Sequence, residues 1–157
     1  MKMINNEIEK VLKTLCKKLK GVNWALVGSA NLALQGVEVR VGDIDILTDK
    51  KGALLIDRLL RQFRVEEVKY RKSGKFSSYF AKFKIDSAKV EVMGDLSLKN
   101  KSGKWVQRGS LLLNKEFIKL GKSKVPTIPL DFELIGYRII RRYAKVRKIE
   151  GVLKKKS

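Results

Sequence analysis

The sequence predicts an α+β fold with a mixed or antiparallel sheet, helices on one face of it, and short helices at the C-terminus. Apolar residues recur at helical spacing near the N-terminus and again after Pro129. From about Val65 the pattern changes to the alternation of apolar and polar residues that is typical of β-strands. The chain has 157 residues, 44% of them hydrophobic. We therefore expect one domain over residues 1–157, with 129–157 as a helical extension.

The first half of the chain predicts two helices and two short strands around a further helical turn. Asn5 or Asn6 can cap the first helix and Gly21 can end it, and its apolar face is formed by Ile8, Val11, Leu12, Leu15 and Leu19. The elements expected after it are a buried strand "NWALV", one or two helical turns "SANLALQG", a second strand "DIDILTD" and the helix "KGALLIDRLLRQF".

The second half predicts a set of antiparallel strands followed by helices. Residues 65–98 alternate, and turn signals at Ser73-Gly74 and Asp86-Ser87 divide them into two or three strands, to which 104–109 can add another. The "GKS" at residues 121–123 resembles the end of a phosphate-binding loop. Position 116 is Glu where that motif needs Gly, so we interpret the segment as a lysine-rich turn. One or two helices with a basic side should follow Pro129.

The composition excludes several kinds of chemistry and favours an anionic partner. The chain has no histidine and one cysteine, Cys16, so disulfide frameworks, Cys/His zinc sites and histidine bases are excluded. A formal net charge of +20 favours RNA, DNA or a nucleotide as partner, although lysine-rich surfaces also occur in proteins from hot environments. No apolar run is long enough to cross a membrane and the N-terminal residues do not resemble a signal peptide, so we expect a cytoplasmic protein.

Two aspartates in an apolar strand form the strongest candidate site. Asp43 and Asp45 are separated by one residue, so both should lie on one face of the strand while Ile44 and Ile46 enter the core. Two neighbouring carboxylates repel each other unless a cation bridges them, and hard oxygen ligands suit Mg²⁺ or Mn²⁺.

Upstream, Gly28 and Ser29 stand where a strand turns into a helix, and there a backbone amide and a hydroxyl can bind phosphate. Glu91 on a later strand is the candidate third carboxylate. Asp86 or Asp95 would take its place after a register shift, and an exposed glutamate facing lysines is the ordinary alternative. Together these residues predict a metal-bound triphosphate that lies across neighbouring strand ends.

The stretch "GSANLALQGVEVRVGDIDIL" resembles the nucleotidyltransferase superfamily with the DNA polymerase beta-type palm. It is most similar to the branches of antibiotic nucleotidyltransferases and nucleotidyltransferase toxins. The resemblance implies that Asp43, Asp45 and Glu91 bind the metal, that Glu91 helps to activate the acceptor hydroxyl, and that Gly28 and Ser29 hold the triphosphate, with Arg40 near the nucleotide. Relatives often carry a Lys-Asp pair in the last helices, whereas this chain has Lys145 without an adjacent acid.

Three functions from different classes fit these observations. The first is an enzyme that moves a nucleoside monophosphate from a nucleoside triphosphate such as ATP to an acceptor hydroxyl. The net charge favours RNA, tRNA among them, or protein as acceptor, over a cationic antibiotic. The second is a nucleic-acid-binding module that keeps the fold without turnover, and the third is an antitoxin or other interaction protein. The intact pair of aspartates ranks the enzyme first.

Overall fold

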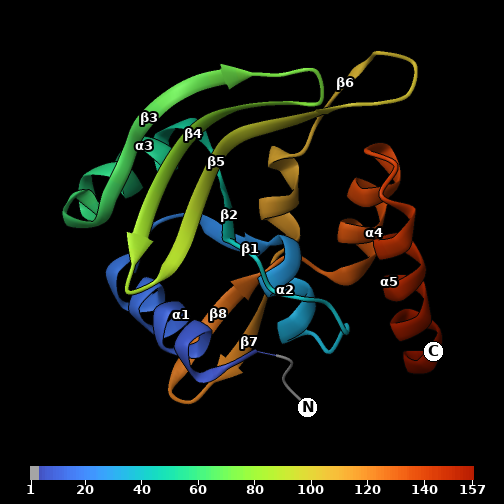
Figure 1. Ribbon diagram of the computed structural model, residues 1–157, viewed down its shortest axis with the longest axis horizontal. Helices are drawn as coiled ribbons and strands as arrows, with labels where there is room; N and C mark the ends of the chain where they lie inside the picture. Colours follow the sequence, from blue (N-terminus) through green and yellow to red (C-terminus); the bar gives the residue numbers. More distant parts are fainter. Residues whose placement is uncertain (1–3) are drawn as a thin grey trace.

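The computed structural model describes residues 4–157 and contains an eight-stranded mixed sheet (Figure 1). Its strand order is β3-β4-β5-β2-β1-β8-β7, and β6 pairs with β5 outside this path. β2 is antiparallel to β1 and parallel to β5, while β8 is parallel to β1. The strands are β1 Trp24–Val27, β2 Ile44–Thr48, β3 Arg64–Lys72, β4 Phe76–Ile85, β5 Ala88–Lys99, β6 Trp105–Gln107, β7 Glu116–Leu120 and β8 Ser123–Thr127.

Five α-helices and two short 3-10 helices accompany the sheet within residues 4–157. At the start of α1 the side chain of Asn5 accepts a hydrogen bond from the amide of Ile8 at 2.8 Å, as expected of an N-cap. The helices are α1 Asn6–Lys18, α2 Gly28–Leu34, α3 Lys50–Leu59, α4 Leu130–Ile139 and α5 Tyr143–Lys156, with 3-10 helices η1 Arg61–Phe63 and η2 Gly109–Asn114.

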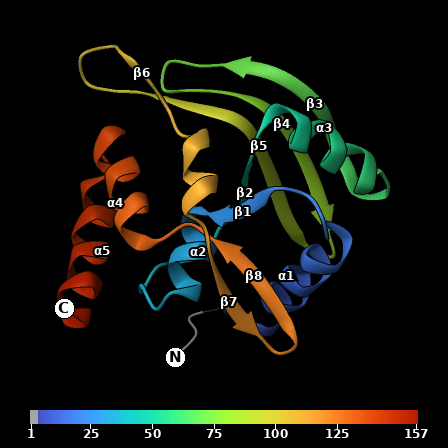
Figure 2. The same ribbon diagram turned by 180° about the vertical axis from the view of Figure 1, so that it is seen from behind.

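The two faces of the central strands have different surroundings. On one face, apolar side chains form the main core with residues of α1 and α3, among them the fully buried Ile44, Ile46, Val90 and Val92. The opposite face turns toward η2 and α4, which lie on the side of the sheet away from α1 (Figure 2). Because strand side chains alternate, the residues between these isoleucines and valines point to this second face.

The expected fold class is confirmed, since helices and a mixed sheet occur in the predicted order. Two details differ. The third helix ends at Leu59 and η1 replaces its expected last turn. The segment interpreted only as a lysine-rich turn is the tip of a hairpin, β7–β8, with Gly121 at φ +63°. No helix in the described part of the chain is long and apolar enough to span a membrane, and residues 1–3 of the expected domain lie outside the described residues.

Candidate active site

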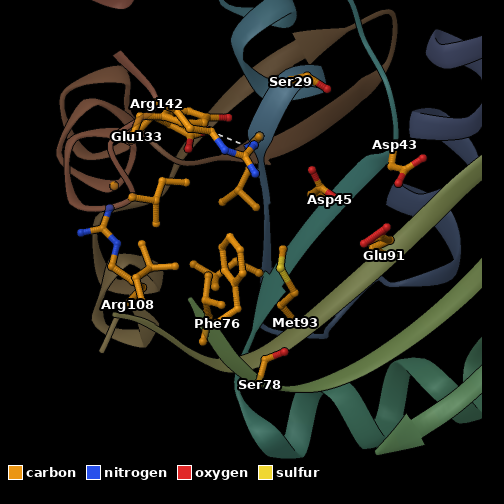
Figure 3. A pocket seen from close by; sticks show the side chains of 18 of the residues that line it. Ser29, Asp43, Asp45, Phe76, Ser78, Glu91, Met93, Arg108, Glu133 and Arg142 are labelled. Atoms are coloured by element: carbon orange, nitrogen blue, oxygen red, sulfur yellow. Dashed lines mark hydrogen bonds between the residues drawn. The ribbon is translucent and has the colours of Figure 1, made fainter. Parts of the chain in front are cut away.

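Asp45 and Glu91 lie side by side on neighbouring strands. β2 and β5 run parallel in a register that pairs Asp45 with Glu91, while Ile44 and Ile46 are fully buried on the other face. Asp43 immediately precedes β2, close enough to Glu91 to raise the pKa of that carboxyl group. Figure 3 shows the three carboxyl groups at one end of a pocket. The structure thus brings together the three acidic residues that the sequence singled out.

The alternatives to Glu91 lie elsewhere. Asp86 is in the turn between β4 and β5, at φ +56°. Asp95 is four residues farther along β5 than Glu91, and its carboxylate accepts a hydrogen bond from the amide of Lys50 at 3.1 Å. The register of β5 therefore places Glu91, and neither of these aspartates, opposite Asp45.

The carboxyl groups destabilise one another's charged forms. The pKa of Asp45 is raised to about 8, first by burial and then by the charges of Glu91, Asp43 and Glu133, while Lys145 opposes them. The pKa of Glu91 is raised to about 7, first by burial and then by the hydrogen bond and charge of Asp43. Such mutual repulsion is the electrostatic condition that a bound cation relieves.

Gly28 allows the chain to pass unusually close to Asp45. Its φ of +76° lies in the left-handed region that favours glycine. A Cβ atom at this position would collide with Oδ2 of Asp45, so the carboxylate can lie against the backbone here only because residue 28 has no side chain. Both the turn and the close approach therefore require glycine here.

Ser29 and Arg40 border the same pocket in different ways. The Ser29 side chain is 8% exposed, and its Oγ accepts a hydrogen bond from the amide of Gly42 at 3.2 Å. This bond ties the first turn of α2 to the loop that carries Asp43, a role the sequence did not indicate. Arg40 is an exposed residue of that loop and lines the pocket.

A fourth acidic residue, Glu133 on α4, was not predicted. Its Oε2 accepts hydrogen bonds from the amide of Gly28 and from Nδ2 of Asn31, both at 2.8 Å. Burial raises its pKa to about 7 although these two bonds lower it. Glu133 thus joins the C-terminal helices to the Gly28-Ser29 turn.

Basic residues surround the opposite side of the pocket. The buried Arg108 donates from Nη2 to the carbonyl oxygen of Phe132 at 2.6 Å, and Lys145 Nζ lies 5.3 Å from the centre of the Tyr137 ring. Burial lowers the pKa of Lys145, and the charge of Arg142 lowers it further, while the charges of Asp45 and Glu133 raise it. Lys145 is therefore within electrostatic reach of Asp45 and Glu133.

The pocket has a volume of about 970 Å³ and two chemically different ends. One end contains the carboxyl groups and the Gly28-Ser29 turn. The other is apolar and includes Phe76, Met93 and Leu111, as Figure 3 shows for the first two. A pocket of this size and mixed lining is typical of a site for a cofactor or substrate.

The carboxyl groups suit a hard divalent cation without forming a complete cage for one. Among residues 4–157, no three Asp, Glu or Cys side chains lie in an arrangement that could by itself hold a metal ion. Asp43, Asp45 and Glu91 nevertheless offer only oxygen donors, and burial and mutual repulsion hold the pKa of Asp45 and Glu91 high. Such a donor set fits Mg²⁺ or Mn²⁺, which keep coordination positions for water and substrate phosphates.

Comparisons with known proteins identify similar chains. The sequence profile described as aminoglycoside-2''-adenylyltransferase matches residues 7–147. TM1012 from Thermotoga maritima, a protein assigned to the nucleotidyltransferases, is 35% identical, with 98% of this chain and 97% of that chain covered and a TM-score of 0.83.

Two further solved structures are similar in fold alone. The lincosamide antibiotic adenylyltransferase LnuA, bound to lincomycin, is 12% identical, with 97% of this chain and 99% of that chain covered and a TM-score of 0.56. An antigenic nucleotidyltransferase-like protein from Paracoccidioides brasiliensis is 16% identical, with 98% and 78% covered and a TM-score of 0.58. A comparison with curated proteins finds no match.

Proposed function

The chain belongs to the aminoglycoside-2''-adenylyltransferase family and is a nucleotidyltransferase, and from this premise we propose its reaction and its site. It transfers a nucleoside monophosphate from a nucleoside triphosphate, ATP among them, to an acceptor hydroxyl, within one domain whose helical extension is 129–157. The observation that supports this most directly is the in-register pairing of Asp45 with Glu91, beside Asp43 and Gly28.

We assign Asp43, Asp45 and Glu91 as the ligands of Mg²⁺ or Mn²⁺. When bound there, the ion supplies positive charge that stabilises the developing charge on the phosphates. The register that pairs Asp45 with Glu91 supports the assignment, because it places two of the carboxyl groups on neighbouring strands, with Asp43 directly before one of them.

The residues of the chain bind and orient the two substrates. Gly28 lets the turn pass close to Asp45, and the Ser29 hydroxyl can donate its proton to a phosphate oxygen while it still accepts from Gly42. Arg40 and Lys145, which line the pocket, place positive charge near the triphosphate.

In the transfer itself the acceptor oxygen bonds to the α-phosphorus and the bond from that phosphorus to the bridging oxygen breaks. Pyrophosphate leaves with the electron pair of the broken bond. The proton of the acceptor hydroxyl passes to a carboxylate oxygen of Glu91, which makes the acceptor oxygen a better nucleophile.

The charges around the pocket favour an anionic acceptor, RNA such as tRNA or an acidic protein. Aminoglycosides are cationic, so a site that binds them needs carboxylates that are not already ligands of the metal. The pocket residues offer only Glu133 beyond the proposed ligands, and its Oε2 already accepts two hydrogen bonds. The basic pocket residues, by contrast, are Arg40, Arg71, Lys72, Arg108, Arg142 and Lys145.

The test is transfer of label from α-labelled nucleoside triphosphates with Mg²⁺ or Mn²⁺, in separate reactions with total RNA, lysate protein and an aminoglycoside. We expect label to be transferred to RNA or protein. Asp45→Asn should abolish this transfer, whereas Asp131→Asn, the same change at an exposed aspartate on α4, should retain it. Transfer that survives Asp45→Asn would overturn the site. No transfer to any acceptor would favour the second candidate, a nucleic-acid-binding or antitoxin protein that keeps the fold without turnover, as its basic composition allows.

A further inference from the structure

Three stretches of the chain are basic and contain no acidic residue. They are residues 68–85, 96–115 and 134–149, and none of them has an Asp or Glu. Each contributes a basic side chain to the lining of the pocket, for example Lys72, Arg108 and Lys145. Basic side chains from all three stretches therefore line the active-site pocket.

Two of these stretches form hairpin tips that lie next to each other. Phe76 pairs with Leu98 where β4 meets β5, and the amide of Lys99 donates to the carbonyl oxygen of Lys75 at 2.9 Å. β6 returns along β5 with Trp105 opposite Lys99. In Figure 1 both tips project beyond the sheet on the side where α4 and α5 lie. We call the following residues the hairpin surface: Lys72, Lys75, Lys99, Lys101, Lys104 and Trp105.

The hairpin surface combines an aromatic ring with ammonium groups. Nζ of Lys72 lies 5.1 Å from the centre of the Trp105 ring, and Nζ of Lys99 lies 5.7 Å from it. The ammonium groups lie over the indole ring, and a nucleobase that replaces them can stack on the ring while they bind the flanking phosphates. Either component alone is common on protein surfaces, but the pair is the combination that single-stranded nucleic acids bind.

The lysines of the hairpin surface are not part of ion-pair networks. In the part of the chain that the structure describes, none of these five lysines lies within 4.0 Å of a carboxylate oxygen in a salt bridge. Lysines that serve thermal stability are organised with acidic partners. This surface therefore keeps its charge available to an anion from outside the chain.

We propose that the hairpin surface binds a single-stranded polynucleotide, which is the acceptor and whose end enters the pocket. The proposal rests on the proposed nucleotidyl transfer and specifies its acceptor. Bases in a duplex are already paired and stacked, so only an unpaired base can stack on Trp105. Lys72 belongs to both the hairpin surface and the pocket lining, so a strand bound by the tips has a continuous path toward Asp45 and Glu91.

The test is equilibrium binding of a short fluorescent oligouridylate without nucleoside triphosphate, measured by anisotropy over a range of salt. Each phosphate contact with a single strand contributes about 0.7 to the slope of log K against log salt, so loss of two contacts reduces the slope by about 1.4 and weakens binding about 25-fold at 0.1 M salt. We expect this result for the double variant Lys72→Gln/Lys99→Gln. The matched control is Lys17→Gln/Lys20→Gln at and just beyond the end of α1, where both lysines are exposed and outside the pocket.

The contribution of stacking is tested separately at Trp105. Trp105→Ala should weaken binding about tenfold with an unchanged salt slope, and Trp105→Phe should retain most of the affinity because it keeps an aromatic face. The proposal would be overturned if Lys72→Gln/Lys99→Gln and Lys17→Gln/Lys20→Gln lost equal affinity for the oligonucleotide. It would also be overturned if inorganic polyphosphate bound as tightly as the oligonucleotide. Transfer of label to lysate protein, without binding of the oligonucleotide, would overturn this inference and leave the proposed nucleotidyl transfer intact.

Discussion

Replacing Asp45 with Asn should stabilise the metal-free protein, although it removes a residue of the active site. Burial and neighbouring carboxyl groups raise the pKa of Asp45 from 3.8 to about 8. At pH 7 the folded protein must therefore hold a proton on this group that the unfolded chain releases. At about 1.4 kcal/mol per pH unit between 3.8 and 7, the cost is about 4 kcal/mol, an upper bound because the neighbouring groups share it.

The direction of the pKa shift determines whether stability rises or falls with pH. The folded-state pKa is above the unfolded value, so the associated stability is fully present below pH 3.8 and is lost as pH rises toward about 8. Denaturant unfolding with a chelator, at pH 5 and pH 8, should show a smaller decrease in stability for Asp45→Asn than for the unmodified protein. The amide is nearly isosteric with the carboxyl group and does not titrate.

Asp57 supplies the matched comparison. It is buried, but it accepts from Nε of Arg64 at 2.7 Å and from the amide of Val68 at 3.3 Å. Asp57→Asn should destabilise the protein by about 2 kcal/mol, because charged hydrogen bonds are lost. If Asp45→Asn destabilised the metal-free protein as Asp57→Asn does, Asp45 would be a structural residue paired with a cation, and the reasoning would be refuted.

Three further changes test the surroundings of the site. Gly28→Ala should abolish nucleotide binding in calorimetry and lower stability by at least about 1 kcal/mol, since a Cβ atom meets Asp45 at a φ of +76°; unchanged binding would contradict the close approach. Arg141→Gly should raise the free energy of unfolding by up to about 1 kcal/mol, because Arg141 follows α4 at φ +59°; a decrease would show that its side chain matters more than its backbone. Glu133→Ala should lower stability by about 2 kcal/mol, as it leaves the Gly28 amide without its acceptor and removes one of the two acceptors of Asn31 Nδ2, whereas Asp131→Ala nearby should change it little.

The carboxylate pair and its strand could be predicted because the signal is local. Asp43 and Asp45 interrupt an apolar run, and alternation alone assigns Ile44 and Ile46 to the opposite face. Glu91 could be named as a candidate from the same alternation. Its position opposite Asp45 depends on a parallel register between distant segments, which the local pattern does not fix.

Other features depend on contacts that sequence patterns do not carry. Glu133 stands in the first turn of a helix, where an acid ordinarily interacts with the helix dipole in solvent, and its partner Gly28 is 105 residues away. The β7–β8 hairpin was missed because lysines and Pro126 weaken its strand pattern, and Pro126 is buried in β8, between β1 and the edge strand β7, where proline is unusual. These residues acquire their roles only when the chain has folded.

Binding of Mn²⁺, followed by electron paramagnetic resonance with a non-hydrolysable nucleoside triphosphate present, tests the central assignment most directly. The unmodified protein and Asp131→Asn should bind Mn²⁺ saturably, and Asp45→Asn should lose that binding, because Asp45 lies between Glu91 and Gly28 at the proposed metal site. Equal Mn²⁺ binding by the unmodified protein and Asp45→Asn would contradict the account.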